Sequence, residues 1–467
     1  MSYGATIIQW LKKSLTQWVE RPEYVYLWVA LISVVGFALI TPPFQGPDEQ
    51  AHYIRVQYLA NGFFTPSSLA SLPDSIAEVA KITFYTDDIR GRTADKYETE
   101  RTLEALKIPL NRDEAYSPQM ITYSPLPYLP SIPGVILSNA LNLSPIVALY
   151  AARLLLGAAS VALFFFAIKL IPYKKYLLMA VGLIPMMLYQ QAMITADSVS
   201  YALLALFIAY VLHLRDKKVI SSRAWFMLGA LCIGVALSKP LVFIFLPLVI
   251  VLIKKKSAMR WLSGIAIACG LLLAGWMMVS SVKEEAAPTW GMPDNVNSAE
   301  QVELITENPK RALRVMWNTY MTQYGDDEIR GVLGIFGAAD VIYPLWMTIG
   351  YACLLGILAT TNFDQRRVKI YYGWKILAIV LSGLYFILVN YALYTGFTPV
   401  NFDIIYGIQG RYFLPILIIA ATAIFTHGVT IVRKDATRMK VHIVISAVVL
   451  VFLALLITYQ RYYLYTP

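Results

Sequence analysis

The chain has 467 residues, of which 58% are apolar and only 15% are charged. Its apolar residues form long blocks such as Leu154–Ile168, which is apolar at nearly every position and too long for a soluble core. The strands of an outer-membrane barrel would instead alternate in polarity. The composition therefore excludes a soluble domain and a barrel, and predicts an all-α polytopic membrane protein.

We expect about eleven transmembrane helices in a single domain that covers residues 1–467. In chain order the predicted spans are Tyr24–Ile40, Pro145–Leu170, Tyr176–Met193, Ser198–Leu214, Ala224–Leu237, Leu241–Ile253, Trp261–Val282, Val341–Thr360, Trp374–Tyr394, Arg411–Val432 and Val441–Tyr459. Ser238-Lys239-Pro240 is interpreted as a tight external turn between two short spans, because proline cannot continue the preceding helix.

The distribution of basic residues predicts the orientation. With a cytoplasmic N-terminus, the inside loops carry clusters of lysine such as Lys174-Lys175 and Lys254-Lys255-Lys256, which follows the positive-inside rule. The formal net charge of +10 is then a signal of topology, and nothing in the sequence supports nucleic-acid binding.

This orientation gives two large external loops, roughly residues 42–144 and 283–340. In the first loop, Asp74–Ile82 and Arg101–Ile108 have the pattern of short amphipathic helices that lie along a membrane surface. Long loops on one face of a helical bundle usually carry the function, so we expect the site there.

The first loop begins with a cluster of ionisable residues just beyond the first span. A helix that starts at Pro47 places Asp48, His52 and Arg55 on one face, with Glu49 beside them. Placed at a membrane face, this cluster suggests chemistry on a lipid-borne substrate. Alternatively, the two acids only offset the positive end of the helix dipole.

A second group of candidates is cationic. Arg411 opens the tenth predicted span at the same external face, and Lys239 lies in an external turn where the charge rule disfavours lysine. Either side chain could hold a phosphate group, and either could instead contact lipid headgroups. Gln409 and Asp197 add polarity nearby, although Asp197 could simply cap the fourth span.

The segment Tyr123–Pro130 has the sequence Tyr-Ser-Pro-Leu-Pro-Tyr-Leu-Pro and cannot form a regular helix. We interpret it as a rigid external loop that lines the site. Tyr123 and Tyr128 could stack on a sugar face, or they could anchor the loop at the membrane interface.

These motifs together resemble a bacterial membrane family called domain of unknown function 2142. The resemblance covers nearly the whole chain and rests on the order and spacing of five motifs, namely Gly46-Pro47-Asp48-Glu49 with His52, Tyr123–Pro130, Thr195-Ala196-Asp197, Ser238-Lys239-Pro240 and Gln409–Pro415. That family is similar to the type C (GT-C) glycosyltransferases, which have many transmembrane helices and an acidic residue in a large first external loop.

The resemblance implies a GT-C-like glycosyltransferase of the bacterial cytoplasmic (inner) membrane, with its site on the external face. It implies inverting transfer of a sugar from a polyprenyl phosphate donor to a glycan or a lipid-linked acceptor. Asp48 would be the general base. Glu49 and His52 would orient the base or the acceptor, or would hold a divalent cation such as Mg or Mn with Asp48. Arg411, Lys239 and Arg55 would bind the donor phosphate. Tyr123, Tyr128, Asp197 and Gln409 would line the site.

Two alternatives from the sequence remain open. A transporter or flippase for lipid-linked saccharides would share the many helices and the basic sites, but it would not need Asp48 as a base. A polymerase or ligase that uses a diphosphate donor is the other alternative. It usually relies on external histidine and arginine side chains, and His52 is the one histidine predicted to be external.

Overall fold

The computed structural model describes residues 17–65, 71–83, 96–112, 115–116, 123–280, 295–321, 323–337, 339–363, 371–426, 429–430 and 433–464. The side chains of 116, 323–328, 430 and 433–435 are not described. Within these ranges the chain is mostly helical, as the composition predicts.

Six helical segments in the described part are long and apolar enough to cross a membrane. They are α2 (Pro22–Ile40), α7 (Pro145–Leu170), α10 (Ala196–Arg215), α12 (Ala258–Ser280), α17 (Tyr372–Gly396) and the segment Ala436–Leu464 within α19 (Arg433–Tyr459) and η6 (Gln460–Leu464). Shorter apolar helices run beside them: α11 (Ser222–Ser238), η3 (Val242–Leu252), α16 (Leu345–Thr360) and the segment Gly410–Ile424. A multi-pass membrane protein is therefore confirmed.

The remaining elements are short. The helices are α3 (Glu49–Ala60), α4 (Ser75–Thr83), α5 (Thr99–Ala105), η2 (Leu126–Ser131), α6 (Ile132–Ala140), α8 (Lys175–Gly182), α9 (Pro185–Ala192), α13 (Ser298–Glu307), α14 (Pro309–Met321), α15 (Gln323–Gly334), η4 (Gly410–Phe413), α18 (Leu414–Ile419) and η5 (Ala420–Ile424). The strands are β1 (Leu72–Pro73) with β2 (Ala115–Tyr116), β3 (Ile335–Phe336) with β4 (Val341–Ile342), and β5 (Thr361–Asn362) with β6 (Val429–Thr430); only the last pair is parallel.

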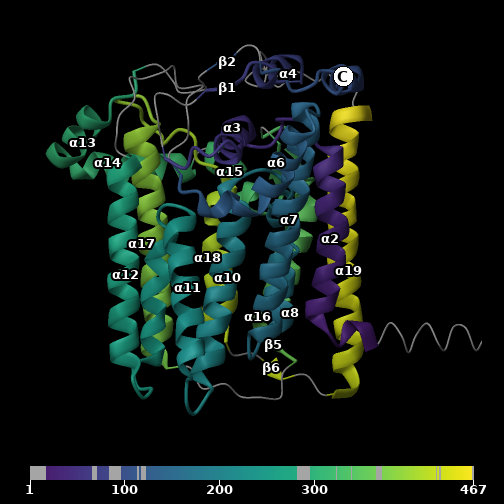
Figure 1. Ribbon diagram of the computed structural model, residues 1–467. Coiled ribbons are helices and arrows are strands. Elements are labelled where there is room, and N and C mark those ends of the chain that lie inside the picture. The colour runs from purple at the N-terminus through teal and green to yellow at the C-terminus, as the bar shows by residue number, and fades with distance from the viewer. Residues whose placement is uncertain are drawn as a thin grey trace, which may run out of the picture.

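The long helices run side by side, and the two ends of the bundle differ (Figure 1). One end carries α3, α4, α13, α14, α15 and the β1–β2 pair, whereas the other carries β5 and β6. Lys174 belongs to the second end, because its ammonium group donates to the carbonyls of Leu358, Ala359 and Thr361 where α16 meets β5. The predicted inside cluster and the first external loop thus lie at opposite ends.

Helix α10 is the centre of the bundle. It packs against α7, α11 and η3, and 83% of its most apolar 18-residue stretch is buried inside the protein. The hydroxyls of Ser160 on α7 and Ser198 on α10 share a hydrogen bond of 2.6 Å, which lets the two helices approach closely. The first turn of α10, with Asp197, is therefore held rigidly among its neighbours.

Several predicted elements are confirmed and others differ. The amphipathic segments of the first loop form α4 and α5. The predicted span Tyr176–Met193 is two helices, α8 and α9, because Pro185 begins a new helix where the first one ends. The segment Leu241–Ile253 forms the 3₁₀ helix η3 around Pro247. The tenth predicted span, Arg411–Val432, forms η4, α18 and the π-helical η5 as far as Ile424, and Val429–Thr430 forms β6. Residues 427–428 and 431–432 of that span lie outside the described residues.

Candidate functional site

The acid cluster beyond α2 is built on a buried ion pair. Arg153 of α7 donates from Nε to Glu49 Oε1 at 2.7 Å and from Nη2 to Glu49 Oε2 at 2.5 Å, and both side chains are completely buried. The other three guanidinium hydrogens are donated to the carbonyls of Ala38, Thr41 and Pro42, at the end of α2. All five donors of Arg153 are thus satisfied, as a buried guanidinium requires.

Glu49 also accepts from the backbone N–H of Ile194 at 3.1 Å, just before α10. Through Arg153 and Ile194, this side chain therefore joins α7, the end of α2 and the connection between α9 and α10 to the start of α3. Both of its oxygens are used in these contacts. These contacts give Glu49 a structural role. They do not support its predicted part in catalysis or as a metal ligand.

The predicted cation site at Asp48, Glu49 and His52 is not supported by the positions of these side chains either. Among the described residues, no group of three or more His, Cys, Asp or Glu side chains is placed to hold a metal ion. Asp48, Glu49 and His52 do not converge because Glu49 is directed to Arg153. We therefore derive no chemistry from Mg or Mn at these residues.

Asp48 lies outside α3 and not within its first turn as predicted. It has a left-handed backbone with φ of 57°, which aspartate tolerates better than most residues, and α3 starts at Glu49. This conformation lets the two neighbouring carboxylates diverge. Asp48 accepts from Arg411 Nη2 at 2.6 Å, and its side chain is 61% exposed.

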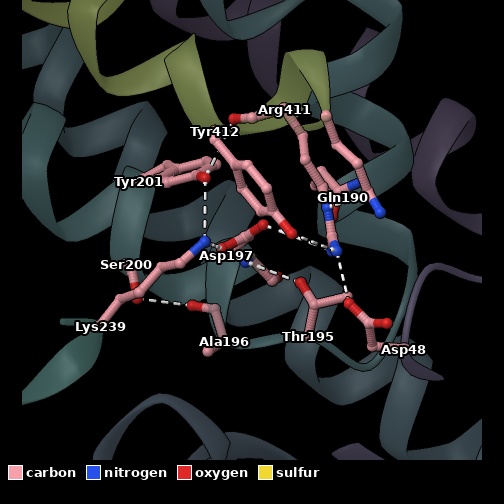
Figure 2. A network of polar contacts seen from close by, with 12 residues as sticks. Asp48, Gln190, Thr195, Ala196, Asp197, Ser200, Tyr201, Lys239, Arg411 and Tyr412 are labelled. Atoms are coloured by element: carbon pink, nitrogen blue, oxygen red, sulfur yellow. Dashed lines mark hydrogen bonds and ion pairs between the residues drawn. The ribbon is translucent and has the colours of Figure 1, made fainter. Parts of the chain in front are cut away.

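Arg411 is the hub of a network of polar contacts (Figure 2). Its side chain is only 3% exposed, and its Nε donates to Gln409 Oε1 at 2.7 Å. Its Nη1 lies 3.6 Å from Asp197 Oδ2, which is buried and has no hydrogen-bond partner in the described part of the chain. The sequence predicted these three residues for the site, and the structure brings them together with Asp48.

Lys239 completes the network from the turn after α11. Its ammonium group forms an ion pair and a hydrogen bond with Asp197 Oδ1 and lies 3.4 Å from the hydroxyl of Tyr201. It also lies 4.9 Å from the centre of the Tyr412 ring, a cation–π distance. Arg411 and Lys239 thus share Asp197 as a common partner.

Two tyrosines in this network were missed by the sequence analysis. Tyr201 donates from its hydroxyl to the backbone carbonyl of Arg411 at 3.0 Å, and this fixes η4 against α10. The ring of Tyr412 lies 5.1 Å from the Arg411 guanidinium carbon. Tyr412 directly follows Arg411 in the sequence, and Tyr201 is one helical turn after Asp197. These spacings from predicted site residues could have indicated both tyrosines.

The proline-rich segment lies against the same site. His52 Nδ1 and the hydroxyl of Tyr128 share a hydrogen bond of 2.6 Å, and the ring of Tyr123 stacks on His52 with centroids 5.8 Å apart. Ser124 donates to the carbonyl of Leu237, two residues before Lys239. The segment is thus held close to Lys239. Its second part, together with Ser131, forms the 3₁₀ helix η2 (Leu126–Ser131), in agreement with the expectation that the segment cannot be a regular α-helix.

The surroundings of His52 and Asp48 determine the charge states of these two side chains. Desolvation, which favours the neutral imidazole, is the main reason that the pKa of His52 falls to about 4, so His52 is uncharged at neutral pH. Desolvation alone would raise the pKa of Asp48, but the charges of Arg411 and Lys239 and the hydrogen bond from Arg411 lower it below its usual value. Asp48 is therefore an ionised carboxylate at neutral pH.

Arg55, predicted to bind phosphate, is engaged elsewhere. Its buried guanidinium donates to the carbonyls of Tyr123 at 3.2 Å and Phe64 at 2.8 Å, and it lies 5.9 Å from the Trp276 ring. Desolvation lowers the pKa of Arg55 to about 10. These contacts tie α3 to the proline-rich segment, which is a structural role.

The site therefore combines one exposed carboxylate with two largely buried cations. Asp197 balances one positive charge and Asp48 the other, so the four charges sum to zero. An anion that reaches Arg411 can replace Asp48 there, because Asp48 is the exposed partner whereas Asp197 is buried. Such a replacement frees an ionised carboxylate beside the bound anion.

Comparison with known proteins gives one match. A family model with the description "Predicted membrane protein (DUF2142)" matches residues 31–420, a range that contains every residue of the network. No curated protein and no solved structure matches the chain. Because the match covers most of the 467 residues, the chain belongs to the DUF2142 family of predicted membrane proteins.

Proposed function

We propose that the protein is a GT-C-like glycosyltransferase that moves a sugar from a polyprenyl phosphate donor to a glycan or a lipid-linked acceptor. The site lies at the external face of the bacterial cytoplasmic membrane, with the N-terminus in the cytoplasm. The observation that supports this proposal best is the pairing of an exposed, ionised Asp48 with the buried Arg411 at 2.6 Å.

The donor phosphate binds where Asp48 now contacts Arg411. A phosphodiester carries one negative charge, and a guanidinium can donate two parallel hydrogen bonds to it. The Arg411 donor that now reaches Asp48 turns to the phosphate, and Lys239 adds a second cation from the other side of Asp197. Sites at the ends of membrane helices suit a donor whose polyprenyl chain stays in the bilayer.

Asp48 then acts as the general base. Its carboxylate takes the proton from an acceptor hydroxyl while the acceptor oxygen forms a bond to the anomeric carbon. The bond between the anomeric carbon and the phosphate oxygen breaks at the opposite side, and its electron pair stays on the phosphate. The configuration at the anomeric carbon is inverted.

The leaving group needs charge stabilisation more than it needs a proton. The departing polyprenyl phosphate gains negative charge in the transition state, and cations that are already held in place stabilise it without reorganisation. Arg411 is held by Gln409 and Tyr412, and Lys239 by Asp197 and Tyr201. Tyr123 offers an aromatic face for the sugar beside His52.

The test is transfer by the purified protein in lipid nanodiscs. A panel of polyprenyl phosphate donors carrying a hexose, an aminosugar or a pentose is incubated with acceptor glycans, and released polyprenyl phosphate is quantified. We expect Asp48→Asn to lower the rate at least about 100-fold, a typical contribution of a general base. Asp403→Asn is the control, because this carboxylate is 84% exposed and lies outside the network.

Two results would count against the proposal. A well-folded Asp48→Asn protein that keeps the wild-type rate would remove Asp48 as the base. Binding of the donors without release of polyprenyl phosphate by the wild-type protein, across the panel and all acceptors, would favour a transporter or flippase.

A further inference from the structure

We propose a second lipid site, for an anionic phospholipid, in the groove between α16 and α19 at the end of the bundle opposite Asp48. The groove has a volume of about 300 Å³. Helix α16 contributes Leu354 and Ile357, and α19 contributes Arg438, His442, Ile443 and Ser446. The site is independent of the proposed transferase chemistry.

The polar residues of the groove form a stripe on one helix. Arg438, His442 and Ser446 follow one another at intervals of four residues, so they lie on the same face of α19 at steps of about 6 Å along its axis. A guanidinium is thus followed, towards the middle of the bundle, by an imidazole and a hydroxyl. This order matches a phospholipid, in which the charged phosphate is outermost and the ester oxygens of the glycerol lie deeper.

The apolar walls fit the acyl chains. Ile357 on α16 is 45% exposed and Ile445 on α19 is 47% exposed, so the helix surfaces beside the groove are apolar and uncovered. In a membrane-spanning bundle such surfaces face hydrocarbon. A free inorganic phosphate would gain nothing from these walls, and therefore we assign the groove to a lipid.

The charge of the groove selects an anionic headgroup. Lys440, on the same helix, already pairs with Glu20 at 2.6 Å. In contrast, no hydrogen bond or ion pair within the described residues uses Arg438 or His442, and both side chains are exposed. An arginine that has no partner among the described residues and lies beside a lipid-facing groove is complementary to a phosphodiester.

The experiment measures lipid binding by native mass spectrometry of the detergent-purified full chain. Wild type, Arg438→Gln and Arg260→Gln are titrated with phosphatidylglycerol, with phosphatidylcholine and with inorganic phosphate. Arg260 is the matched control, because it is an exposed arginine near the start of α12, outside the groove. Thermal unfolding verifies that each variant is folded.

We expect the wild-type protein to bind phosphatidylglycerol more tightly than phosphatidylcholine. Arg438→Gln should weaken phosphatidylglycerol binding about fivefold or more, the change expected for one basic residue near an anionic membrane surface. Arg260→Gln should leave it unchanged, and inorganic phosphate should not compete. Equal loss in the two variants, equal binding of the two lipids, or displacement by inorganic phosphate would overturn the proposal.

Discussion

Asp48 and Glu49 are consecutive in the chain, yet their carboxylates form ion pairs with two different arginines, Arg411 and Arg153. The Glu49 pair is completely buried and links the start of α3 to α2, to α7 and to the connection between α9 and α10, whereas the Asp48 side chain is 61% exposed. The left-handed backbone at Asp48 separates them. Glu49 thus anchors the start of α3, while Asp48 remains exposed beside Arg411.

The two acids should differ sharply in their effect on stability. Glu49→Gln leaves the charge of Arg153 buried without its counter-ion, and breaking a buried ion pair in this way costs about 3–5 kcal/mol. Asp48→Asn removes a largely exposed carboxylate, and Arg411 keeps the nearby Asp197 and its hydrogen bond to Gln409, so this substitution should cost less than Glu49→Gln. Thermal unfolding in detergent compares the two variants with wild type.

A double variant tests whether the loss of stability in Glu49→Gln comes from the unpaired charge of Arg153. Glu49→Gln combined with Arg153→Met removes both charges, and we expect it to recover part of the lost stability. If Glu49→Gln and Asp48→Asn unfold at the same temperature, the division of roles between the two acids is wrong.

Gly410 should be required next to the hub of the site. A β-carbon at this position would lie 2.1 Å from the Gly331 carbonyl carbon and 2.2 Å from the Val332 nitrogen, both backbone atoms of α15. The clash cannot be relieved by a side-chain rotation, so Gly410→Ala should shift η4 with Arg411 and cost about 1–3 kcal/mol. Thermal unfolding and polyprenyl monophosphate binding should both be impaired.

The matched control for Gly410→Ala is Gly350→Ala in the middle of α16. Apart from the backbone of α16 itself, no atom of the described residues lies within 4 Å of a β-carbon at Gly350. Alanine is about 1 kcal/mol more favourable than glycine in a helix interior. We therefore expect Gly350→Ala to be neutral or stabilising. An unchanged unfolding temperature in Gly410→Ala would contradict the close packing of η4 on α15.

The stability of the protein should fall as the pH is lowered from about 6.5 to about 4. The pKa of His52 drops in this range on folding, from its usual 6.5 to about 4, mainly through desolvation, so the unfolded chain binds more protons than the folded one. The loss should be about 3 kcal/mol in all, at about 1.4 kcal/mol per pH unit. Thermal unfolding measured from pH 7 to pH 4 gives the slope.

His52→Gln tests the assignment of this slope, because glutamine does not titrate. The variant should lose most of the pH dependence in that window. The lowered pKa of Asp48 contributes stability that disappears at still lower pH, below its usual value of 3.8, so it does not mask the effect. A slope that is the same in wild type and His52→Gln would refute the role of His52.

The sequence predicted the long elements well because their apolar blocks are strong signals. The predicted span Pro145–Leu170 coincides with α7, and the turn at Ser238-Lys239-Pro240 follows the end of α11. The sequence-based prediction failed where the backbone conformation of single residues determines where a helix begins. Pro185 begins a second helix within one apolar block, and Asp48 adopts a left-handed backbone that moves the start of α3 by two residues from Pro47.

The site was predicted in part. The motifs around Asp48, Asp197, Lys239 and Arg411 are far apart in the chain, and the structure brings all four together. The ion pair of Glu49 was not predicted, because its partner Arg153 is 104 residues away within an apolar helix and no local pattern links the two. Long-range ion pairs of this kind cannot be read from spacing.

The central claim is that a donor phosphate takes the place of Asp48 on Arg411. The most direct test is the affinity for polyprenyl monophosphate, measured by native mass spectrometry for wild type, Asp48→Asn and Arg411→Gln. We expect Asp48→Asn to bind at least as tightly as wild type, because the phosphate no longer competes with a carboxylate for Arg411. Arg411→Gln should bind about tenfold more weakly or worse, since a hydrogen bond to a charged group contributes about 1.5–3 kcal/mol. Equal affinity of all three proteins, or equal loss in both variants, would contradict the account.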